Sequence, residues 1–299
     1  MAVIALKIDV DTYRGTREGA LRLAGLLQRL ALPATFLFSL GPDHTGRAIR
    51  RAFRRGFFSK VRRTSVLAHY GLRTLLYGVL LPGPHIGRRC RGSMQEIAQR
   101  GFEVGVHTWD HVRWQDGVVR ASEAWTRREL TLARDEFMAV FGQAPRVHGA
   151  AGWQMNPYVP ALQHELGFRY ASDTRGRGPF LPRLGPGSAA VPQLPTTLPT
   201  LDELIGRADL AGTDPVDHLL ALTAAAPARD QVFTLHAELE GGKYLPSFER
   251  LLRAWRERGT QLTDLASYAA MLDLHNLPRC AVVAGTVPGR SGTLAVQAS

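Results

Sequence analysis

The sequence predicts an α/β domain built on parallel strands. Short runs of β-branched and other apolar residues alternate with stretches of helical periodicity along most of the 299 residues. Strands that alternate with helices pair in parallel through right-handed crossovers, which gives either a barrel-like or a doubly wound domain. The composition, with 45% hydrophobic and 21% charged residues, is that of a globular protein with one large core or two modest ones.

Six segments have the length and composition of buried strands. They are Val3–Asp9, Ala34–Leu40, Phe102–His107, Val147–Ala150, Arg169–Ala171 and Gln231–His236. Helical spacing of apolar residues predicts helices at Thr16–Leu30, Met94–Gln99 and Ala121–Phe141. Gly142 follows the last of these helices, and glycine readily adopts the left-handed conformation that ends a helix.

The ends of the chain and its cysteines bear on its location. Met1 is followed almost at once by a strand, without the pattern of a signal peptide. No window reaches the ~18 uncharged apolar residues of a membrane-spanning helix. The two cysteines, Cys90 and Cys280, lie far apart and favour a reducing compartment. We therefore expect a cytoplasmic protein, unless a membrane surface holds it, with one domain over residues 1–275 and a mobile tail over 276–299.

Asp9 and Asp11 stand at the carboxyl end of the first expected strand. Residues two apart in a strand point to the same face, so these carboxylates lie side by side. Parallel α/β folds place their active sites at this end of the strands. Two close carboxylates repel unless a cation lies between them or one is protonated. The motif alone leaves a second interpretation equally open, in which one aspartate caps a helix and the other is solvated.

His107 and His111 are four residues apart and follow the third expected strand. Their side chains converge on one cation if the chain turns helically there, although a His-x-x-x-His motif alone is only moderately specific. With Asp11 they form a two-histidine, one-aspartate set that leaves positions open for water and substrate, which is typical of catalytic metal sites. Such a set accepts Zn²⁺, Co²⁺ or Mn²⁺.

His236 ends the last expected strand and would face the same edge of the sheet. It is interpreted either as a core histidine bonded to the backbone or as a general acid. A metal site at the strand ends favours the general acid.

These motifs resemble those of the polysaccharide deacetylase (carbohydrate esterase, NodB-homology) superfamily. Within it, the chain is similar to the deformylases of undecaprenyl-phosphate-linked 4-deoxy-4-formamido-L-arabinose. The resemblance spans residues 3–275 and is carried by Ile8–Gly19, His107–His111, Ala150–Trp153, Tyr170–Gly176, Leu194–Thr200 and Thr234–Glu238. It implies a distorted (β/α) barrel of parallel strands with an inserted amphipathic helical segment. It also implies metal-dependent hydrolysis of the formamide to the free amine, for lipid A modification and polymyxin resistance.

The resemblance also assigns roles to single residues. Asp11, His107 and His111 match the metal ligands of the family, Asp9 its general base and His236 its general acid. Asp173 falls where the family has an aspartate that orients and tunes the acid histidine. The Arg-x-Pro-Tyr motif of the family is replaced here by Ala150-Ala-Gly-Trp153, so whatever its arginine does for the base must be done otherwise or not at all.

Substrate contacts are expected from the segment that replaces this motif and from a nearby arginine. A backbone N–H near Ala151 and Trp153 would hold the developing oxyanion. Arg175 would contact a phosphate, because the guanidinium group suits that geometry. The alternative for Arg175 is a solvated arginine in a loop.

One segment accounts for the net charge of +11. Between His44 and Gln95 there are twelve basic residues and no acidic one. Apolar residues of this segment share one helical face, which is typical of an interfacial helix on anionic lipid. The residues expected at the membrane are Arg50, Arg51, Phe53, Arg54, Arg55 and Phe57, within a membrane-binding insertion over residues 45–91. The alternative is an ordinary amphipathic helix packed on the barrel.

Together these features predict an enzyme on the cytoplasmic side of the inner membrane, attached peripherally, that acts on a lipid-linked amino sugar. A deacetylase of another N-acyl amino sugar or of a glycan is the alternative enzyme. A membrane-bound module that has lost its chemistry is the alternative outside catalysis. No recognition motif accompanies the basic segment, so no nucleic-acid partner is expected.

Overall fold

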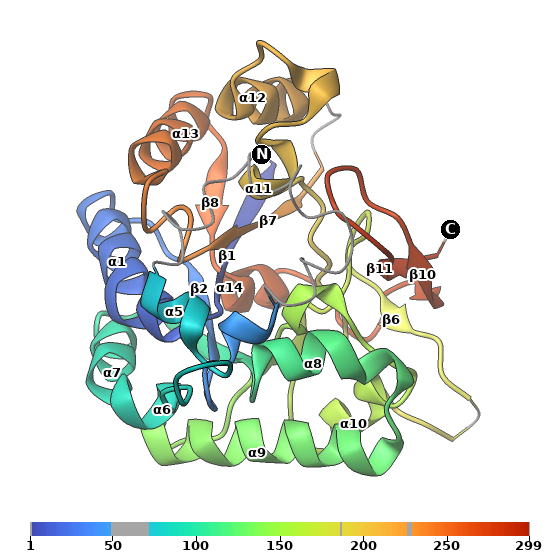
Figure 1. Cartoon of the computed structure of the whole chain (residues 1–299). Coiled ribbons are helices and arrows are strands. Elements are labelled where there is room, and N and C mark those ends of the chain that lie inside the picture. The colour runs from blue at the N-terminus through green and yellow to red at the C-terminus, as the bar shows by residue number, and fades with distance from the viewer. Residues whose placement is uncertain (1, 49–71, 186, 226–228, 299) are drawn as a thin grey trace.

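The main sheet is a curled, barrel-like layer of parallel strands (Figure 1). The computed structural model describes residues 2–48, 72–185, 187–225 and 229–298. Along the sheet the order is β5-β4-β3-β2-β1-β7, and β8 also pairs with β1. The strands are β1 (Val3–Val10), β2 (Thr35–Ser39), β3 (Glu103–Thr108), β4 (Val147–His148), β5 (Tyr170–Ala171), β7 (Gln231–His236) and β8 (Gln261–Thr263).

β1 is the central strand, and all eight of its residues are buried. It pairs with β2 on one side and with β7 on the other, and its register sets Asp9 opposite Leu37 and His236. Strands of a parallel sheet that are covered on both faces are largely apolar, which explains the runs VIALKIDV and TFLFS. Lys7 and Asp9 interrupt the apolar run of β1, and their charges therefore need partners inside the fold.

Helices ring the sheet (Figure 1). The longer ones are α1 (Ala20–Arg29), α7 (Arg91–Gln99), α9 (Glu123–Phe141), α12 (Pro215–Ala225) and α13 (Leu245–Glu257). The shorter ones are α5 (Leu72–Leu76), α6 (Ile86–Arg89), α8 (His111–Gly117), α10 (Val159–Glu165), α11 (Leu201–Leu204) and α14 (Leu265–Ala270). Their apolar faces and the strands bury one large core, to which Phe36, Phe233 and Trp255 contribute.

The expected fold class is confirmed, since the strands are parallel and curl into part of a barrel with helices outside. The six expected strands all form, with ends shifted by a few residues. α9 begins after Ser122, whose hydroxyl accepts from the Trp125 amide, and ends at Gly142 in the left-handed conformation, with a φ of 71°. The helix expected from Thr16 starts as a π-helical turn, Gly15–Gly19, and continues as α1.

The residues expected at the membrane, Arg50, Arg51, Phe53, Arg54, Arg55 and Phe57, lie outside the described residues. α5, α6 and part of α7 follow within the range expected for the insertion. No helix in the described part of the chain is long and apolar enough to cross a membrane.

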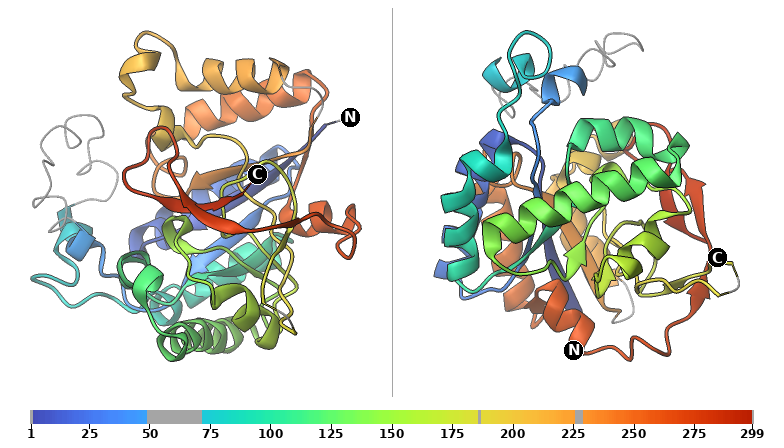
Figure 2. Two further views of the ribbon diagram at one scale, coloured as in Figure 1. Left: turned by 90° about the vertical axis from the view of Figure 1, so that its right-hand side faces the viewer. Right: turned by 90° about the horizontal axis from the view of Figure 1, so that it is seen from below.

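The carboxyl-terminal segment differs from the mobile tail that the sequence predicts. β9 (Arg279–Cys280) pairs with β6 (Leu181–Pro182), and β10 (Val282–Gly285) forms a hairpin with β11 (Leu294–Gln297). The hairpin lies on the side of the molecule opposite α1 and α7 (Figures 1 and 2).

Burial and hydrogen bonds attach the hairpin to the domain. Leu294 and Ala295 are buried, and Arg175 exchanges backbone hydrogen bonds with Ala295 and Gln297. In the loop between the strands, Gly289 has a φ of 86°, and a Cβ there would lie 2.2 Å from the carbonyl oxygen of Glu203. Short strands of two to four residues without acidic residues have little signal of their own, so composition alone suggested a mobile segment.

Candidate metal centre

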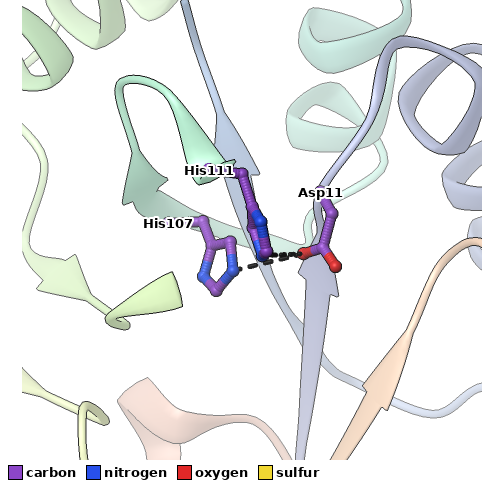
Figure 3. A group of neighbouring side chains, drawn as sticks. All are labelled: Asp11, His107 and His111. Atoms are coloured by element: carbon purple, nitrogen blue, oxygen red, sulfur yellow. Dashed lines mark ion pairs between the residues drawn. The ribbon is translucent and has the colours of Figure 1, made fainter. Parts of the chain in front are cut away.

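Asp11 lies directly after β1, where the central strand opens onto the carboxyl edge of the sheet. Its neighbours come from β3 and from the first residue of α8. Its Oδ1 atom is 3.2 Å from Nε2 of His107 and 3.5 Å from Nε2 of His111. Figure 3 shows the three side chains pointing toward one another.

The turn from β3 into α8 explains how both histidines reach the same point. His107 is in the strand, and Asp110 caps α8 by accepting from the amide of Arg113 at 3.1 Å. The chain therefore turns helically between the histidines, and their ring centroids lie 5.3 Å apart. Asp110 is fixed in turn by Nδ1 of His44 at 2.6 Å.

The donor atoms of Asp11, His107 and His111 fit a divalent metal ion. One ligand atom from each residue lies within 4.8 Å of the others, and among the described residues no other group of this kind is found. Oδ1 of Asp11 is buried without a hydrogen-bond donor, as expected for an oxygen reserved for a cation. One carboxylate and two imidazoles suit Zn²⁺, Co²⁺ or Mn²⁺ and leave positions for water and substrate.

The charges around Asp11 favour an ionised ligand. Burial alone would raise its pKa, but His111 and His107 outweigh burial and hold the Asp11 pKa well below its usual range. Burial lowers the pKa of His111, which favours the neutral imidazole that binds a metal. His107 differs, because the charges of Asp9 and Asp11 raise its pKa against the effect of burial.

Glu238 holds the loop that carries Asp11. Its Oε1 atom accepts from the amides of Asp11 and Thr12, at 3.1 and 2.9 Å, and from the Thr12 hydroxyl at 2.7 Å. Burial and the nearby charge of Asp11 raise the pKa of Glu238 to about 8. Gly15 makes this contact possible, since a Cβ at that position would lie 1.8 Å from Oε1 of Glu238. Glu238 follows His236 by two residues, but this spacing alone does not reveal that Glu238 binds the loop after β1.

His236 lies across from Asp9 in the register of β1 and β7, so its strand is a direct neighbour of the first strand. Its side chain is 16% exposed, and its ring packs edge-on against Trp153 with centroids 6.1 Å apart. The structure thus brings Asp9 and His236 to the edge of the sheet that holds Asp11, His107 and His111.

Asp173 does not have the partner that the resemblance implies, which is His236. It is fully buried, and its carboxylate is bound by Nδ1 of His148 at 2.7 Å and the amide of Ala150 at 2.8 Å. The side-chain amides of Gln163 and Gln193 bind its other oxygen. Four donors other than His236 thus bind Asp173, which makes it a structural anchor beside β4 and β5.

The carboxylate beside His236 is that of Asp202. Its Oδ1 atom is 3.5 Å from Nδ1 of His236. Oδ2 of Asp202 is 3.0 Å from Arg290, which comes from the loop between β10 and β11. Burial would raise the Asp202 pKa, but the charges of Arg290 and His236 keep it below its ordinary value. Sequence reasoning missed Asp202, although it lies two residues after the Leu194–Thr200 stretch, because nothing in its spacing pairs it with His236.

Ala151 and Trp153, expected to offer a backbone N–H to the oxyanion, lie in the turn after β4, and the Trp153 amide already has a backbone partner. Ala151 and Trp153 are buried, and the amide of Trp153 donates to the carbonyl of Ala150 at 3.0 Å. Trp153 has a φ of 51°, which is rare for a bulky residue, and its indole donates to the Thr196 hydroxyl at 3.1 Å. Strained residues of this kind persist where surrounding contacts determine them, often at functional sites.

Arg175 is buried, which rules out the solvated loop arginine of the alternative interpretation, and protein groups bind the guanidinium that was expected to contact a phosphate. Only 7% of the residue is exposed, and its guanidinium binds Glu203 and the carbonyl of Leu198. The guanidinium carbon lies 5.1 Å from the centre of the Trp153 ring. Arg175 therefore packs against the Trp153 ring inside the fold.

Comparisons with known proteins identify the family that the chain resembles. The sequence model of the polysaccharide deacetylase family matches residues 3–171. A 4-deoxy-4-formamido-L-arabinose-phosphoundecaprenol deformylase of Shewanella sediminis is 33% identical, with 99% of this chain and 95% of the relative covered. The protein of the same name from Wigglesworthia glossinidia brevipalpis is 31% identical, with 95% of this chain and 98% of the relative covered.

A solved structure supports the fold. The crystal structure described as a polysaccharide deacetylase from Mycobacterium smegmatis superposes with a TM-score of 0.64 at 19% identity. The alignment covers 95% of this chain and 94% of that chain, so the likeness extends over both.

Removal of either histidine tests the metal centre. We expect His107→Ala and His111→Ala to lose bound metal, because a catalytic site with three protein ligands does not retain its ion after the loss of one. Metal content per chain after dialysis, by elemental analysis, is the measurement. His164→Ala on the exposed face of α10 is the control and should keep its metal. Stoichiometric metal in both site variants would contradict the ligand assignment.

Proposed function

The chain belongs to the polysaccharide deacetylase family, and from this membership we propose that it hydrolyses the formamide of undecaprenyl-phosphate-linked 4-deoxy-4-formamido-L-arabinose. The products would be formate and the free amine, for use in lipid A modification and resistance to polymyxin. The observation that carries the proposal is the convergence of Asp11, His107 and His111 with an acid–base pair beside them.

The metal ligands in this proposal are Asp11, His107 and His111. A divalent ion held by them would polarise the formyl oxygen and make water acidic enough to lose a proton near neutral pH. Which of Zn²⁺, Co²⁺ and Mn²⁺ serves is a matter for metal analysis of the purified protein.

Asp9 and His236 are proposed as the base and the acid. Asp9 accepts a proton from the attacking water as its oxygen bonds to the formyl carbon. His236 donates a proton to the sugar nitrogen as the C–N bond breaks, so that the amine leaves neutral. The two side chains come from paired positions on neighbouring strands, which sets them at the same edge of the sheet.

Trp153 supplies an apolar wall beside the acid. Its ring contacts His236 edge-on and is surrounded by Lys7, Arg175 and Arg290, each within 5.5 Å of the ring centre. A rigid aromatic wall of this kind limits water and orients a sugar ring beside the imidazole. A deacetylase of another N-acyl amino sugar would use the same parts, so the acyl group must be identified by experiment.

The assay that tests the proposed function compares two substrates. The metal-loaded protein is incubated with the formamido- and the acetamido-arabinose phospholipids, and the free amine is detected by mass spectrometry. We expect amine from the formamido lipid at a rate well above that from the acetamido lipid. Preferred release of acetate would favour the alternative deacetylase, and no amine from either substrate would favour an inactive module.

Asp202 and Asp173 can be distinguished by substitution. We expect Asp202→Asn to retain metal and fold while kcat falls by up to roughly 10²-fold, because the imidazole of His236 loses the carboxylate beside it. Asp173→Asn should instead cost about 3–5 kcal/mol of unfolding free energy, because the buried pair with His148 is broken. Urea unfolding and steady-state kinetics separate the two effects. An Asp173→Asn protein that is stable but inactive, beside a fully active Asp202→Asn, would reverse this assignment.

Attachment to the membrane is proposed from sequence alone. The segment Arg47–Arg63 contains eight basic residues and no acid, and each basic residue near an anionic surface contributes about 1 kcal/mol. A lipid-linked substrate keeps its undecaprenyl tail in the bilayer, so peripheral attachment to the cytoplasmic side of the inner membrane would bring the site to the sugar.

Charge reversal tests this attachment. We expect the combined change of Arg50, Arg51, Arg54 and Arg55 to glutamate to release the protein from anionic vesicles, and salt to weaken wild-type binding. Co-sedimentation with vesicles measures both. Hydrolysis of a short-chain, water-soluble substrate should survive in the variant, while hydrolysis of the full lipid in vesicles falls. Equal loss of both activities would mean that the segment supports the barrel.

A further inference from the structure

Lys7 is a charged side chain with no exposed surface, in the middle of the central strand. An ammonium group is costly to bury unless it is paired and hydrogen-bonded. The neighbours of Lys7 in β1 are apolar up to Asp9, so the strand next to it offers no nearer charge to compensate the ammonium group. A partner inside the fold must therefore account for it.

Three contacts surround the ammonium group. Nζ donates to the carbonyl oxygen of Ser172 at 2.9 Å and lies 3.3 Å from Oδ2 of Asp9. It also lies 5.5 Å from the centre of the Trp153 ring. Lys7 and Asp9 are two residues apart in β1, so their side chains leave the strand on the same face.

The contact with Lys7 leaves the two oxygens of Asp9 in different surroundings. Oδ2 faces the ammonium group. Oδ1 is buried without a hydrogen-bond partner and lies 3.8 Å from Nδ1 of His107, on the side of the metal ligands. The ion pair therefore fixes the rotation of the carboxylate and turns one oxygen toward the reacting centre.

The surrounding backbone leaves room for this arrangement. Gly149 follows β4, and a Cβ at that position would lie 3.1 Å from Cε and 3.3 Å from Nζ of Lys7. A Cβ there would also lie 2.4 Å from Leu37, so a larger residue would press on both side chains. The absence of a side chain at position 149 thus lets the lysine extend fully to Asp9 and Ser172.

We propose that Lys7 is the positioning residue of the base, holding Oδ2 of Asp9 so that Oδ1 faces the attacking water. The inference rests on the proposed function, since it takes Asp9 as the base. Lys7 also supplies a cation beside the base, in a chain whose Ala150–Trp153 segment has no arginine. Lys7 reaches Asp9 from the same strand, whereas an arginine in that segment would reach it from the loop after β4.

Lys7→Met removes the charge and keeps most of the length of the side chain. We expect bound metal and KM to stay close to wild type, while kcat falls about 10- to 100-fold because the base is misdirected. Leu6→Ala is the matched control, since Leu6 is buried in the adjacent position of β1 and belongs to the core. It should lose stability but keep the kcat of the folded fraction.

Lys7→Ala allows chemical rescue. The side-chain atoms removed beyond Cβ correspond to propylammonium, which should restore kcat in a saturable way. The alcohol 1-propanol has the same size but no charge and should not restore kcat. If Lys7→Met fails to fold, Lys7→Ala prepared in propylammonium takes its place. The proposal would be overturned if a folded, uncharged variant kept a kcat within about 3-fold of wild type, which is on the order of experimental scatter in such differences. The proposal would also be overturned if propylammonium restored the midpoint of unfolding but not kcat.

Crystal structures of wild type and Lys7→Met test the geometry without a substrate. The proposal expects the Asp9 carboxylate to rotate in the variant, so that neither oxygen keeps its place beside Nδ1 of His107. An unchanged carboxylate would overturn it. If wild type hydrolyses no N-acyl sugar at all, the proposed function fails, and the crystallographic result still decides whether Lys7 orients Asp9.

Discussion

Two carboxylates must be held close together at the end of the central strand, where little water can screen them. Asp9 lies near the end of β1 and Asp11 directly follows the strand; both carboxylates neighbour the His107 ring, and both are largely removed from solvent. Each therefore depends on positive or hydrogen-donating neighbours: Lys7 beside Asp9, and His107 and His111 beside Asp11. A divalent ion would complete the compensation of charge, which makes the same arrangement both a structural requirement and a site for chemistry.

The sheet supplies these neighbours because the carboxyl ends of its parallel strands meet at one edge. β1 presents the carboxylates, β3 and the start of α8 the two histidines, and β7 the proposed acid, His236. Segments further along the chain then fix these groups in place. Glu238 binds the loop after β1, and Arg290 reaches from the carboxyl-terminal hairpin to Asp202 beside His236. The loop between the last two strands thus contacts the carboxylate beside the proposed acid.

Most of the fold, and the convergence of Asp11, His107 and His111, could be predicted, because strand-end motifs depend on local spacing. Asp-x-Asp, His-x-x-x-His and a histidine at a strand end keep their geometric meaning wherever the strand lies in the sheet. The partners of Asp173 and His236 could not be predicted, because long loops decide which carboxylate meets which imidazole.

Lys7 was missed for a different reason: one polar residue in an apolar strand does not reveal whether it faces solvent or a buried acid. The tail was misjudged because its stability comes from contacts with Arg175 and Glu203 rather than from its own composition.

The central claim is that Asp11, His107 and His111 hold one metal ion beside Asp9 and His236. Anomalous diffraction from crystals grown with Co²⁺ or Zn²⁺, recorded on both sides of the absorption edge of the metal, tests it most directly. The account predicts one strong peak, about 2.0–2.2 Å from Oδ1 of Asp11 and from a ring nitrogen of each histidine. A peak bound by Asp9 in place of Asp11, or no peak in this cluster at full metal loading, would contradict it.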